Sequence, residues 1–367
     1  MSLLSETAAS VLSCSILSTQ SLSSVNVTAA SVVGGEVMGQ SITGDTVSTP
    51  SLVLNKRNIE VVSPLMTVSS GGDILSSPPA GNFFTTVNNT LFKIANDVAG
   101  NQFIWIAVGQ KNSLGVGATM AISGDGVNWT AHPSPPPGDT ITAIAFANNL
   151  WVCSVATHGM FYSHDGITWT VGSGTQLSFA KSIVYAQNLW VAVGSNVGSK
   201  QVYSTDGINW VAGTGSTFDF SGFSVAATDN LFVAVGYSNG SNLLVSEDGK
   251  SWTVPTTGPT FTFGYSVAVN PDQGLWVVVG EGQNMYTSSD GLVWTQITYN
   301  DIRATSLAWS GGKFIAIGNP KIGGTANQAT SVNGVLWTTN PLPVTYTGGG
   351  TAQNTKANAL RSVVTAV

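Results

Sequence analysis

Short apolar runs recur along the middle of the chain and indicate its expected fold. Each begins with Trp or Phe, continues through β-branched residues and Ala, and usually ends in Gly. The six runs are residues 105–109, 151–155, 190–194, 232–236, 276–280 and 314–318. Continuous apolar runs of about five residues predict strands that are buried on both faces. A further strand is predicted just before five of these runs, at residues 141–146, 182–185, 224–227, 266–269 and 305–309.

A turn motif, Ser-x-Asp-Gly-x-x-Trp, follows each run. Its six copies are Ser123, Asp125, Gly126, Trp129; Ser163, Asp165, Gly166, Trp169; Ser204, Asp206, Gly207, Trp210; Ser246, Asp248, Gly249, Trp252; Ser288, Asp290, Gly291, Trp294; and Ser331, Asn333, Gly334, Trp337. Successive copies are 40 to 43 residues apart, which is the length of a four-stranded propeller blade. Each unit therefore reads strand, strand, strand, turn, strand.

The residue types of the motif suit a rigid hairpin. An Asp side chain accepts hydrogen bonds from backbone N–H groups just downstream, and the Ser hydroxyl bonds the same turn. Gly tolerates positive φ, and Trp begins the outer strand, where it can pack between neighbouring blades. We therefore expect a structural role for Asp125, Asp165, Asp206, Asp248 and Asp290. A cation site is disfavoured because one carboxylate per turn is too few.

These turns resemble the Asp-box, or BNR, repeat, whose usual form is Ser/Thr-x-Asp-x-Gly-x-Thr-Trp. Here Gly follows Asp directly and the loop is one residue shorter. The resemblance covers about 250 of the 367 residues. It implies an all-β propeller whose boxes lie between the third and fourth strand of each blade, are structural, and lie away from any active site. Six boxes imply six blades, and a seventh without a box can be assembled from the residues before 100 and the C-terminal tail.

The N-terminal segment has a different period, with an apolar residue at every fifth position. These residues are Leu12, Leu17, Leu22, Val27, Val32, Val37, Ile42, Val47 and Leu52. The period fits neither a helix nor a strand. It fits a pentapeptide-type β-helix, or a fibrous shaft in which three chains bury these residues between them; a disordered Ser/Thr-rich tail is the third alternative. The Ser/Thr-rich pentads, ending at 52–59, resemble the shaft-to-head junctions of phage and large-virus fibre proteins.

Four regions follow from these patterns. Residues 1–62 are expected to anchor or oligomerise the chain, 63–85 to form a linker, and 86–345 to form the propeller. Residues 346–367 are expected to be a Gly-rich linker and a tail. The strand-like end of that tail, 360–367, is expected either to join the first blade or to add to a neighbouring subunit.

Composition narrows the function classes. Charged residues make up 8% of the chain, its net charge is -6, and it has three arginines, Arg57, Arg303 and Arg361. No nucleic-acid partner is therefore expected. No apolar run is long enough for a membrane span, and the first residues lack the features of a signal peptide. Two cysteines, Cys14 and Cys153, are expected to be free thiols.

No catalytic constellation stands out. The three histidines lack metal-ligand spacing, and neither a metal nor a cofactor is expected. Sialidases, which share the Asp-box propeller, need a cluster of arginines for the substrate carboxylate, whereas this propeller has only Arg303. No pair of carboxylates is singled out for glycoside hydrolysis either.

We therefore expect a non-enzymatic attachment protein that folds in a host cytoplasm and acts at a virion surface. Its expected partners are copies of itself, as a homotrimer or other oligomer, further capsid or particle proteins, and a host glycan or protein. An intracellular assembly scaffold is the alternative; propellers of the photosystem-assembly type resemble it, but they have a basic groove that this sequence lacks. A glycosidase is the second alternative.

Overall fold

The computed structural model describes residues 65–340 except 69–71, 78–84, 89, 102, 113, 197, 282–284, 299–300 and 321–327. The regular elements in these residues are strands, β1 to β29, so the predicted all-β class is confirmed. No helix in the described part of the chain could span a membrane. The predicted N-terminal segment at 1–62 and the tail at 346–367 lie outside the described residues.

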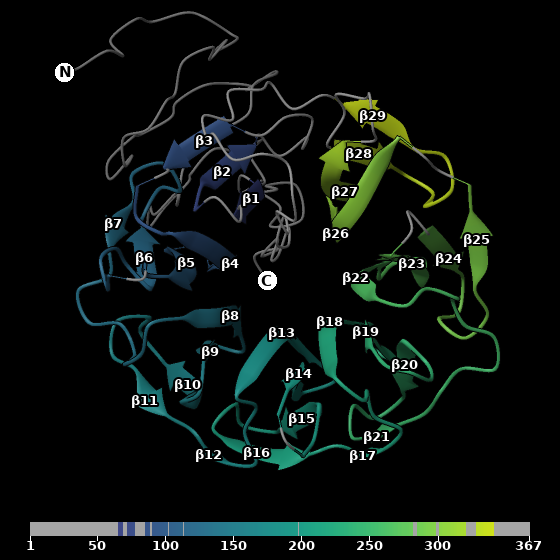
Figure 1. Ribbon diagram of the computed structural model, residues 1–367, viewed down its shortest axis with the longest axis horizontal. Coiled ribbons are helices and arrows are strands. Elements are labelled where there is room, and N and C mark those ends of the chain that lie inside the picture. Colours follow the sequence, from purple (N-terminus) through teal and green to yellow (C-terminus); the bar gives the residue numbers. More distant parts are fainter. Residues whose placement is uncertain are drawn as a thin grey trace, which may run out of the picture. The chain divides into compact units, whose positions relative to one another are not determined.

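In the described residues, seven sheets of three to five strands follow one another round a ring, which is a seven-bladed β-propeller, and one further sheet has two strands (Figure 1). The first three consist of β1 Leu65–Val68, β2 Ile74–Ser77 and β3 Thr85–Asn88; β4 Ile94–Gly100, β5 Trp105–Gln110, β6 Met120–Ser123 and β7 Thr130–Ala131; and β8 Ile141–Ala147, β9 Leu150–Val155, β10 Gly159–Ser163 and β11 Thr170–Val171.

Short parallel strand pairs lie at the rim of the next two sheets. The fourth has β12 Ser173–Gly174, β13 Phe179–Ala186, β14 Leu189–Ser195, β15 Gln201–Ser204 and β16 Asn209–Ala212, and the fifth has β18 Ser221–Ala227, β19 Phe232–Tyr237 and β20 Leu243–Ser246. Between them run β17 Thr214–Gly215 and β21 Ser251–Trp252. The last two are β22 Gly264–Asn270, β23 Leu275–Gly280, β24 Met285–Ser288 and β25 Thr295–Ile297, then β26 Ile302–Ser310, β27 Lys313–Pro320, β28 Gln328–Ser331 and β29 Thr338–Asn340.

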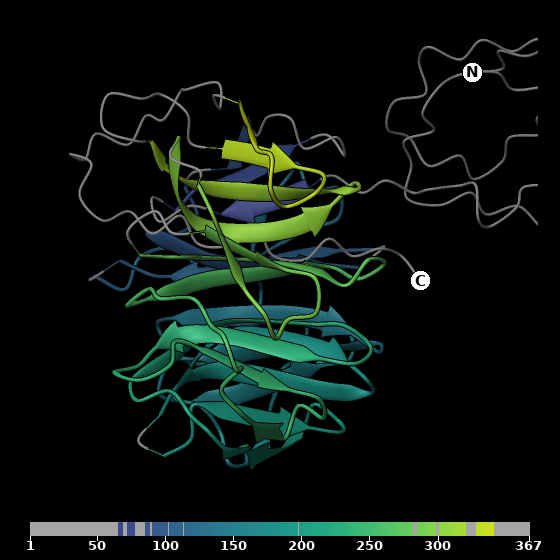
Figure 2. The same ribbon diagram turned by 90° about the vertical axis from the view of Figure 1, so that its right-hand side faces the viewer.

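The strands predicted from the sequence are confirmed. The aromatic runs become the second strand of six sheets, and the strands before them become the innermost strands, β8, β13, β18, β22 and β26, together with β4. The strands run from one face of the ring to the other (Figure 2). Each of the six motif turns connects a third strand to the fourth, as the resemblance implied.

The hydrophobic core lies between neighbouring blades. One cluster joins Ile106 and Val108 of β5 to Ile144, Trp151 and Cys153 of the next sheet, all of them buried. Corresponding clusters repeat round the ring. Second strands are buried on both faces because a blade is covered on each side by another blade, which explains why their sequences show no polar alternation.

Backbone hydrogen bonds also link blades at the rim. After its fourth strand, the third blade continues into β12, which pairs in parallel with β16 of the next blade. The N–H groups of Ser173 and Thr175 donate to the carbonyls of Ile208 and Trp210, both at 2.8 Å. In the same way β17 pairs in parallel with β21. The third blade is therefore tied to the fourth, and the fourth to the fifth, at the rim as well as through the core.

The prediction of a linker over residues 63–85 is corrected by the first sheet. Strands β1 and β2 lie inside that range, and Met66, Val68 and Ile74 are buried against Phe92 and Trp105 of the neighbouring blade. The Ser, Pro and Gly residues that suggested a linker come between strands in the sequence. Each of these strands has only four residues, which is too few to show a hydrophobic period. The seven sheets also settle the blade number, which the sequence analysis left at six or seven.

Candidate functional site

The six motif turns share the hydrogen bonds that their Asp or Asn side chain accepts. In the first, the N–H groups of Val127 and Asn128 donate to Asp125 Oδ1 at 2.8 and 2.7 Å, and the Ser123 hydroxyl donates to the same oxygen at 3.0 Å. The Gly126 N–H donates to Ser123 Oγ at 2.9 Å. Asp165, Asp206, Asp248, Asp290 and Asn333 accept the equivalent backbone bonds in their own turns.

These bonds favour the charged carboxylate. The backbone N–H groups of Thr168 and Ile167 lower the pKa of Asp165 to about 2. Desolvation opposes the charge of Asp125 and Asp206, but the hydrogen bonds outweigh it and lower the pKa of each to about 2. Among the described residues, no group of three or more Asp, Glu, His and Cys side chains is placed to hold a metal ion. The carboxylates therefore serve the turns that contain them.

The Gly of each motif has a second role, contact with the preceding blade. Gly207 has φ +73°, and a Cβ there would lie 2.5 Å from Leu150 Cδ2 on β9. A Cβ on Gly291 would lie 2.4 Å from Leu231 Cδ2 on the preceding blade. Gly126 has more space around it, because the nearest atom to a Cβ there would be 3.4 Å away. The turns therefore fasten one blade to the next.

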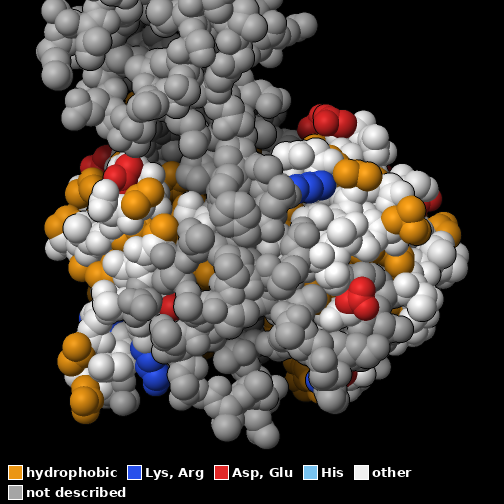
Figure 3. All heavy atoms as spheres, turned by 90° about the horizontal axis from the view of Figure 1, so that it is seen from above, with side chains coloured by type: hydrophobic (Ala, Val, Ile, Leu, Met, Phe, Trp, Pro, Cys, Tyr) orange, Lys and Arg blue, Asp and Glu red, His pale blue; other side chains and the backbone are white. Residues whose placement is uncertain are grey.

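His132 and Cys153, two other residues with reactive side chains, are buried in the propeller. His132 is buried, and its Nε2 lies 2.8 Å from the carbonyl oxygen of Gly166 in the turn of the next blade. Cys153 is buried, and desolvation raises the pKa of its thiol well above the usual range. Where Figure 3 shows described residues, charged side chains are few and scattered rather than gathered into a patch.

A ladder of aromatic rings is the surface feature best suited to binding. Phe220 stacks on Tyr237 with ring centroids 4.3 Å apart, and Tyr237 stacks on Phe263 at 4.2 Å. Phe263 also lies 6.5 Å from Phe223 and 6.4 Å from Tyr265. We call these five residues the aromatic ladder. Phe220 is 45% exposed, and the other four rings are partly buried.

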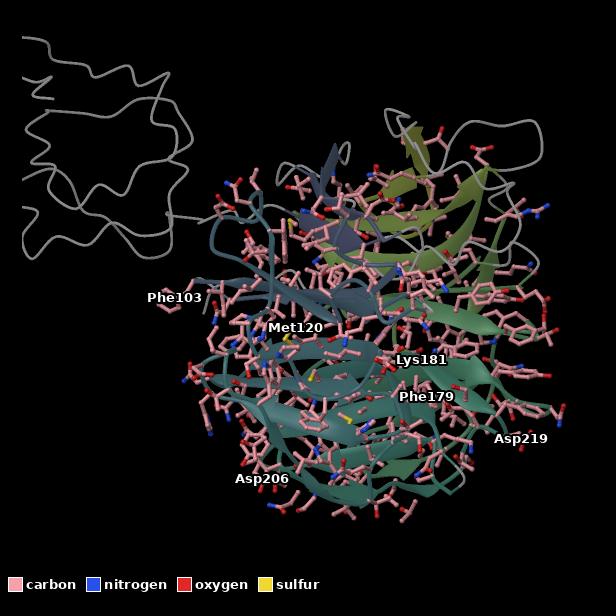
Figure 4. All side chains as sticks on the ribbon, turned by 60° about the vertical axis from the view of Figure 1, so that its left-hand side comes forward. Phe103, Met120, Phe179, Lys181, Asp206 and Asp219 are labelled. Carbon is pink, nitrogen blue, oxygen red and sulfur yellow. The ribbon has the colours of Figure 1, made fainter. Side chains whose placement is uncertain are left out.

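Strand pairing places the ladder. Tyr237 ends β19 and pairs with Ser221 of β18, while an isolated bridge joins it to Phe263 just before β22. Phe223 and Tyr265 are the residues skipped at the bulges of β18 and β22. Because Phe232, at the other end of β19, pairs with the turn residue Ser246, the ladder and the turns lie at opposite ends of the strands. Figure 4 shows this separation: Asp206 of a turn and Asp219, next to Phe220, are on opposite sides of the ring.

Two carboxylates lie beside the ladder. Asp219 accepts hydrogen bonds from the Asn239 N–H and the Ser238 hydroxyl, each at 2.8 Å, and these bonds lower its pKa. Burial, and then the charge of Glu281, raise the pKa of the Tyr265 hydroxyl. The ladder is therefore an apolar strip beside negative charge.

The sequence analysis did not single out the ladder. The available signal was the density of aromatic residues at 218–223 and 261–265, just before two innermost strands. Within each segment, Phe218 and Phe261 are buried while Phe220 and Phe263 join the ladder. Which ring would be core and which would be surface depends on strand register across two blades.

Comparison with known proteins supports the fold alone. No family model matches the chain, and no curated protein is similar to it. Among solved structures, one titled "YCF48 bound to D1 peptide" aligns with a TM-score of 0.52 and 15% identity over 71% of this chain and 86% of that one. The structure of U3-55K aligns with a TM-score of 0.52 and 8% identity over 70% and 85%. A chain of the mitotic checkpoint complex aligns with a TM-score of 0.52 and 10% identity over 76% and 95%.

Proposed function

We propose that this chain is a non-enzymatic attachment protein of a virus particle, in which the propeller is a head that binds a protein partner through the aromatic ladder. The ladder is the observation that carries the proposal. Aromatic residues supply most of the energy at the centre of many protein interfaces, because they bury a large area at low conformational cost. A partly exposed strip of them on a rigid ring is already ordered for binding.

The form of the ladder favours a protein segment over a sugar. Stacked rings cover one another's faces, so the strip offers ring edges along its length and the exposed ring of Phe220 at its end. A sugar stacks on an open aromatic face, whereas an extended segment can place several apolar side chains along ring edges. The neighbouring Asp219 and Glu281 favour a partner that also carries Lys or Arg. YCF48, a propeller of similar fold, binds a D1 peptide, which supports a peptide-binding role for this chain.

The viral part of the proposal rests on the sequence. The five-residue apolar period at positions such as Leu12 and Leu52, and its resemblance to fibre junctions, support a shaft of three chains that mounts the head on a particle. In this role the chain folds in the host cytoplasm and contacts other capsid proteins. An assembly scaffold would use the same ladder but would not need the shaft.

A peptide display library tests the head. The full chain is expected to enrich peptides with several apolar residues and at least one Lys or Arg. The double variant Phe220→Ala/Tyr237→Ala is expected to bind them about tenfold more weakly or worse. Phe103→Ala is the matched control, because Phe103 is 67% exposed and lies on the opposite face (Figure 4). Equal binding by the double variant, or enrichment on a glycan array without any peptide, would contradict a protein-binding ladder.

Two further measurements test the rest of the proposal. Size-exclusion chromatography with light scattering should give a trimer for the full chain, and a monomer would contradict the shaft without bearing on the head. A panel of fluorogenic sialosides and other glycosides should show no turnover. Hydrolysis of any of them would overturn the non-enzymatic role and favour the glycosidase alternative.

A further inference from the structure

Two Asn-Gly pairs occur in the chain, Asn239-Gly240 and Asn333-Gly334. In such a pair the Gly nitrogen can attack the amide carbon of the Asn side chain, because Gly has no Cβ to block the approach. The attack gives a cyclic succinimide and ammonia, and water then opens the ring to an aspartate. Both reacting groups already lie on adjacent residues, so water is the only other reactant. The surroundings of each pair therefore decide how fast it reacts.

The turn motif restrains the Asn333 pair. Oδ1 of Asn333 accepts hydrogen bonds from the N–H groups of Val335 and Leu336 at 3.1 and 2.9 Å. The Ser331 hydroxyl donates to the same oxygen at 3.2 Å. Rotation of the side chain would break these bonds, and Gly334 is buried. This pair is therefore an internal reference for a restrained Asn.

The Asn239 pair is open. Asn239 and Gly240 lie in the loop between β19 and β20, and both are exposed. In the part of the chain that the structure describes, Asn239 is bonded through its backbone N–H, and no hydrogen bond holds its side-chain amide. A Cβ built at Gly240 would meet no atom within 4 Å. The amide of Asn239 is therefore able to turn towards the Gly240 nitrogen, and water reaches both.

A hydrogen-bonded relay begins at that nitrogen. The Gly240 N–H donates to Ser238 Oγ at 3.4 Å, and the Ser238 hydroxyl donates to Asp219 Oδ2 at 2.8 Å. Ser238 is buried, and its own N–H donates to Asn242 Oδ1 at 2.6 Å. The bond from the Asn239 N–H, and then that from Ser238, lower the pKa of Asp219, which keeps it charged at neutral pH. A proton that leaves the attacking nitrogen therefore has a path to a carboxylate.

We propose that Asn239 converts itself to aspartate, with Ser238 as the relaying base and Asp219 as the positioning residue behind it. The Gly240 nitrogen bonds to Asn239 Cγ while its proton passes to Ser238 Oγ and the Ser238 proton passes to Asp219. The Cγ–Nδ2 bond then breaks, and ammonia leaves with the proton that Asp219 received. Water adds to the succinimide and opens it at either carbonyl, which gives an aspartyl or an isoaspartyl residue at 239.

The new carboxylate would lie beside the aromatic ladder. Residue 239 is two positions after Tyr237, and its N–H is bonded to Asp219, the neighbour of Phe220. The conversion adds one negative charge to a strip that already has Asp219 and Glu281 beside it, and so strengthens its preference for a partner with Lys or Arg. This effect on the partner rests on the proposed function, whereas the conversion itself does not.

Peptide mapping of the full chain by mass spectrometry tests the conversion. Freshly purified protein is held folded at neutral pH, and aspartate and isoaspartate at 239 and 333 are measured over time. A synthetic peptide of residues 235–244 is the unfolded reference. Position 239 is expected to convert about tenfold or more faster than the same position in the peptide, and faster than position 333. A rate at 239 equal to or below that of the peptide would overturn the proposal, because Asn-Gly reacts slowly without any relay.

Two variants test the relay. Asp219→Asn and Ser238→Ala are each expected to slow conversion at 239 about tenfold. Asp229→Asn is the control, because Asp229 is an exposed carboxylate in the loop before β19 and should leave the rate unchanged. Asp219→Asn should also make the rate rise more steeply with pH, because hydroxide then replaces the carboxylate as the base. Wild-type rates in both relay variants, or an unaltered pH profile in Asp219→Asn, would refute the relay.

The effect on the ladder is measured separately. Asn239→Asp is expected to bind Lys- or Arg-containing peptides about twofold to fivefold more tightly than Asn239→Gln, which has the unconverted amide on a longer side chain. Added salt should reduce the difference, because the new charge is exposed. Equal binding by the two variants would overturn the effect on the partner, and the mapping experiment would still decide whether Asn239 converts.

Discussion

Gly207 allows the link between turn and neighbouring blade to be tested quantitatively. In Gly207→Ala the new methyl would lie 2.5 Å from Leu150 Cδ2 and 3.1 Å from Trp190 Nε1, at φ +73°. An Ala at positive φ costs about 1–2 kcal/mol, and overpacking a well-packed core costs about 1–3 kcal/mol more. We expect the free energy of unfolding to fall by about 2–5 kcal/mol.

Gly126→Ala is the matched control. Gly126 occupies the same place in the first motif with the same φ of +73°, but the nearest atom to its Cβ would be 3.4 Å away. Only the backbone cost of about 1–2 kcal/mol should therefore appear. Urea unfolding followed by tryptophan fluorescence measures both variants, with the midpoint shifted and the slope unchanged.

A double variant isolates the steric contribution. Leu150→Ala alone is expected to cost about 2–5 kcal/mol through the cavity it creates. Combined with Gly207→Ala, it should cost less than the sum of the two by about 1–3 kcal/mol, because the methyl then enters the space that Leu150 left. Equal losses for Gly207→Ala and Gly126→Ala, with strictly additive effects in the double variant, would refute the interblade role of the turn.

Three further predictions follow from buried and charged groups. The pKa of Asp125, Asp165 and Asp206 is lowered to about 2 in the folded protein from an ordinary value of 3.8, so their stabilisation is present above about pH 4 and is lost as the pH falls towards 2. Acid unfolding should be shallower in this range when all three are replaced by Asn, and an unchanged profile would contradict it. Ser224→Ala leaves the Val267 N–H without the hydroxyl that it bonds at 3.3 Å, which should lower the free energy of unfolding by about 1–3 kcal/mol in urea titrations; a neutral result would mean that this interblade bond contributes nothing. Cys153, buried with a raised pKa, should react with a thiol reagent only after denaturation in a Cys14→Ser variant, and labelling of the folded protein would show that β9 opens.

Much of the fold could be predicted from the sequence because its signals are local. The apolar runs, such as 190–194, predicted second strands, and the Ser-x-Asp-Gly motif predicted hairpins whose hydrogen bonds join residues two or three apart. The prediction of a linker at 63–85 was wrong because strands as short as β1 and β2 show no hydrophobic period. Their side chains are buried by Phe92 and Trp105 of another blade.

The sequence by itself determined the repeat, the order of strands within a blade and the structural use of the turn aspartates, because these depend on residues close together in the chain. Only the tertiary structure decided the number of blades, the contact of each turn Gly with the blade before it, and the stacking of Phe220, Tyr237 and Phe263. These features join residues about 20 to 60 positions apart, and their geometry follows from how neighbouring sheets pack, which a local pattern does not encode.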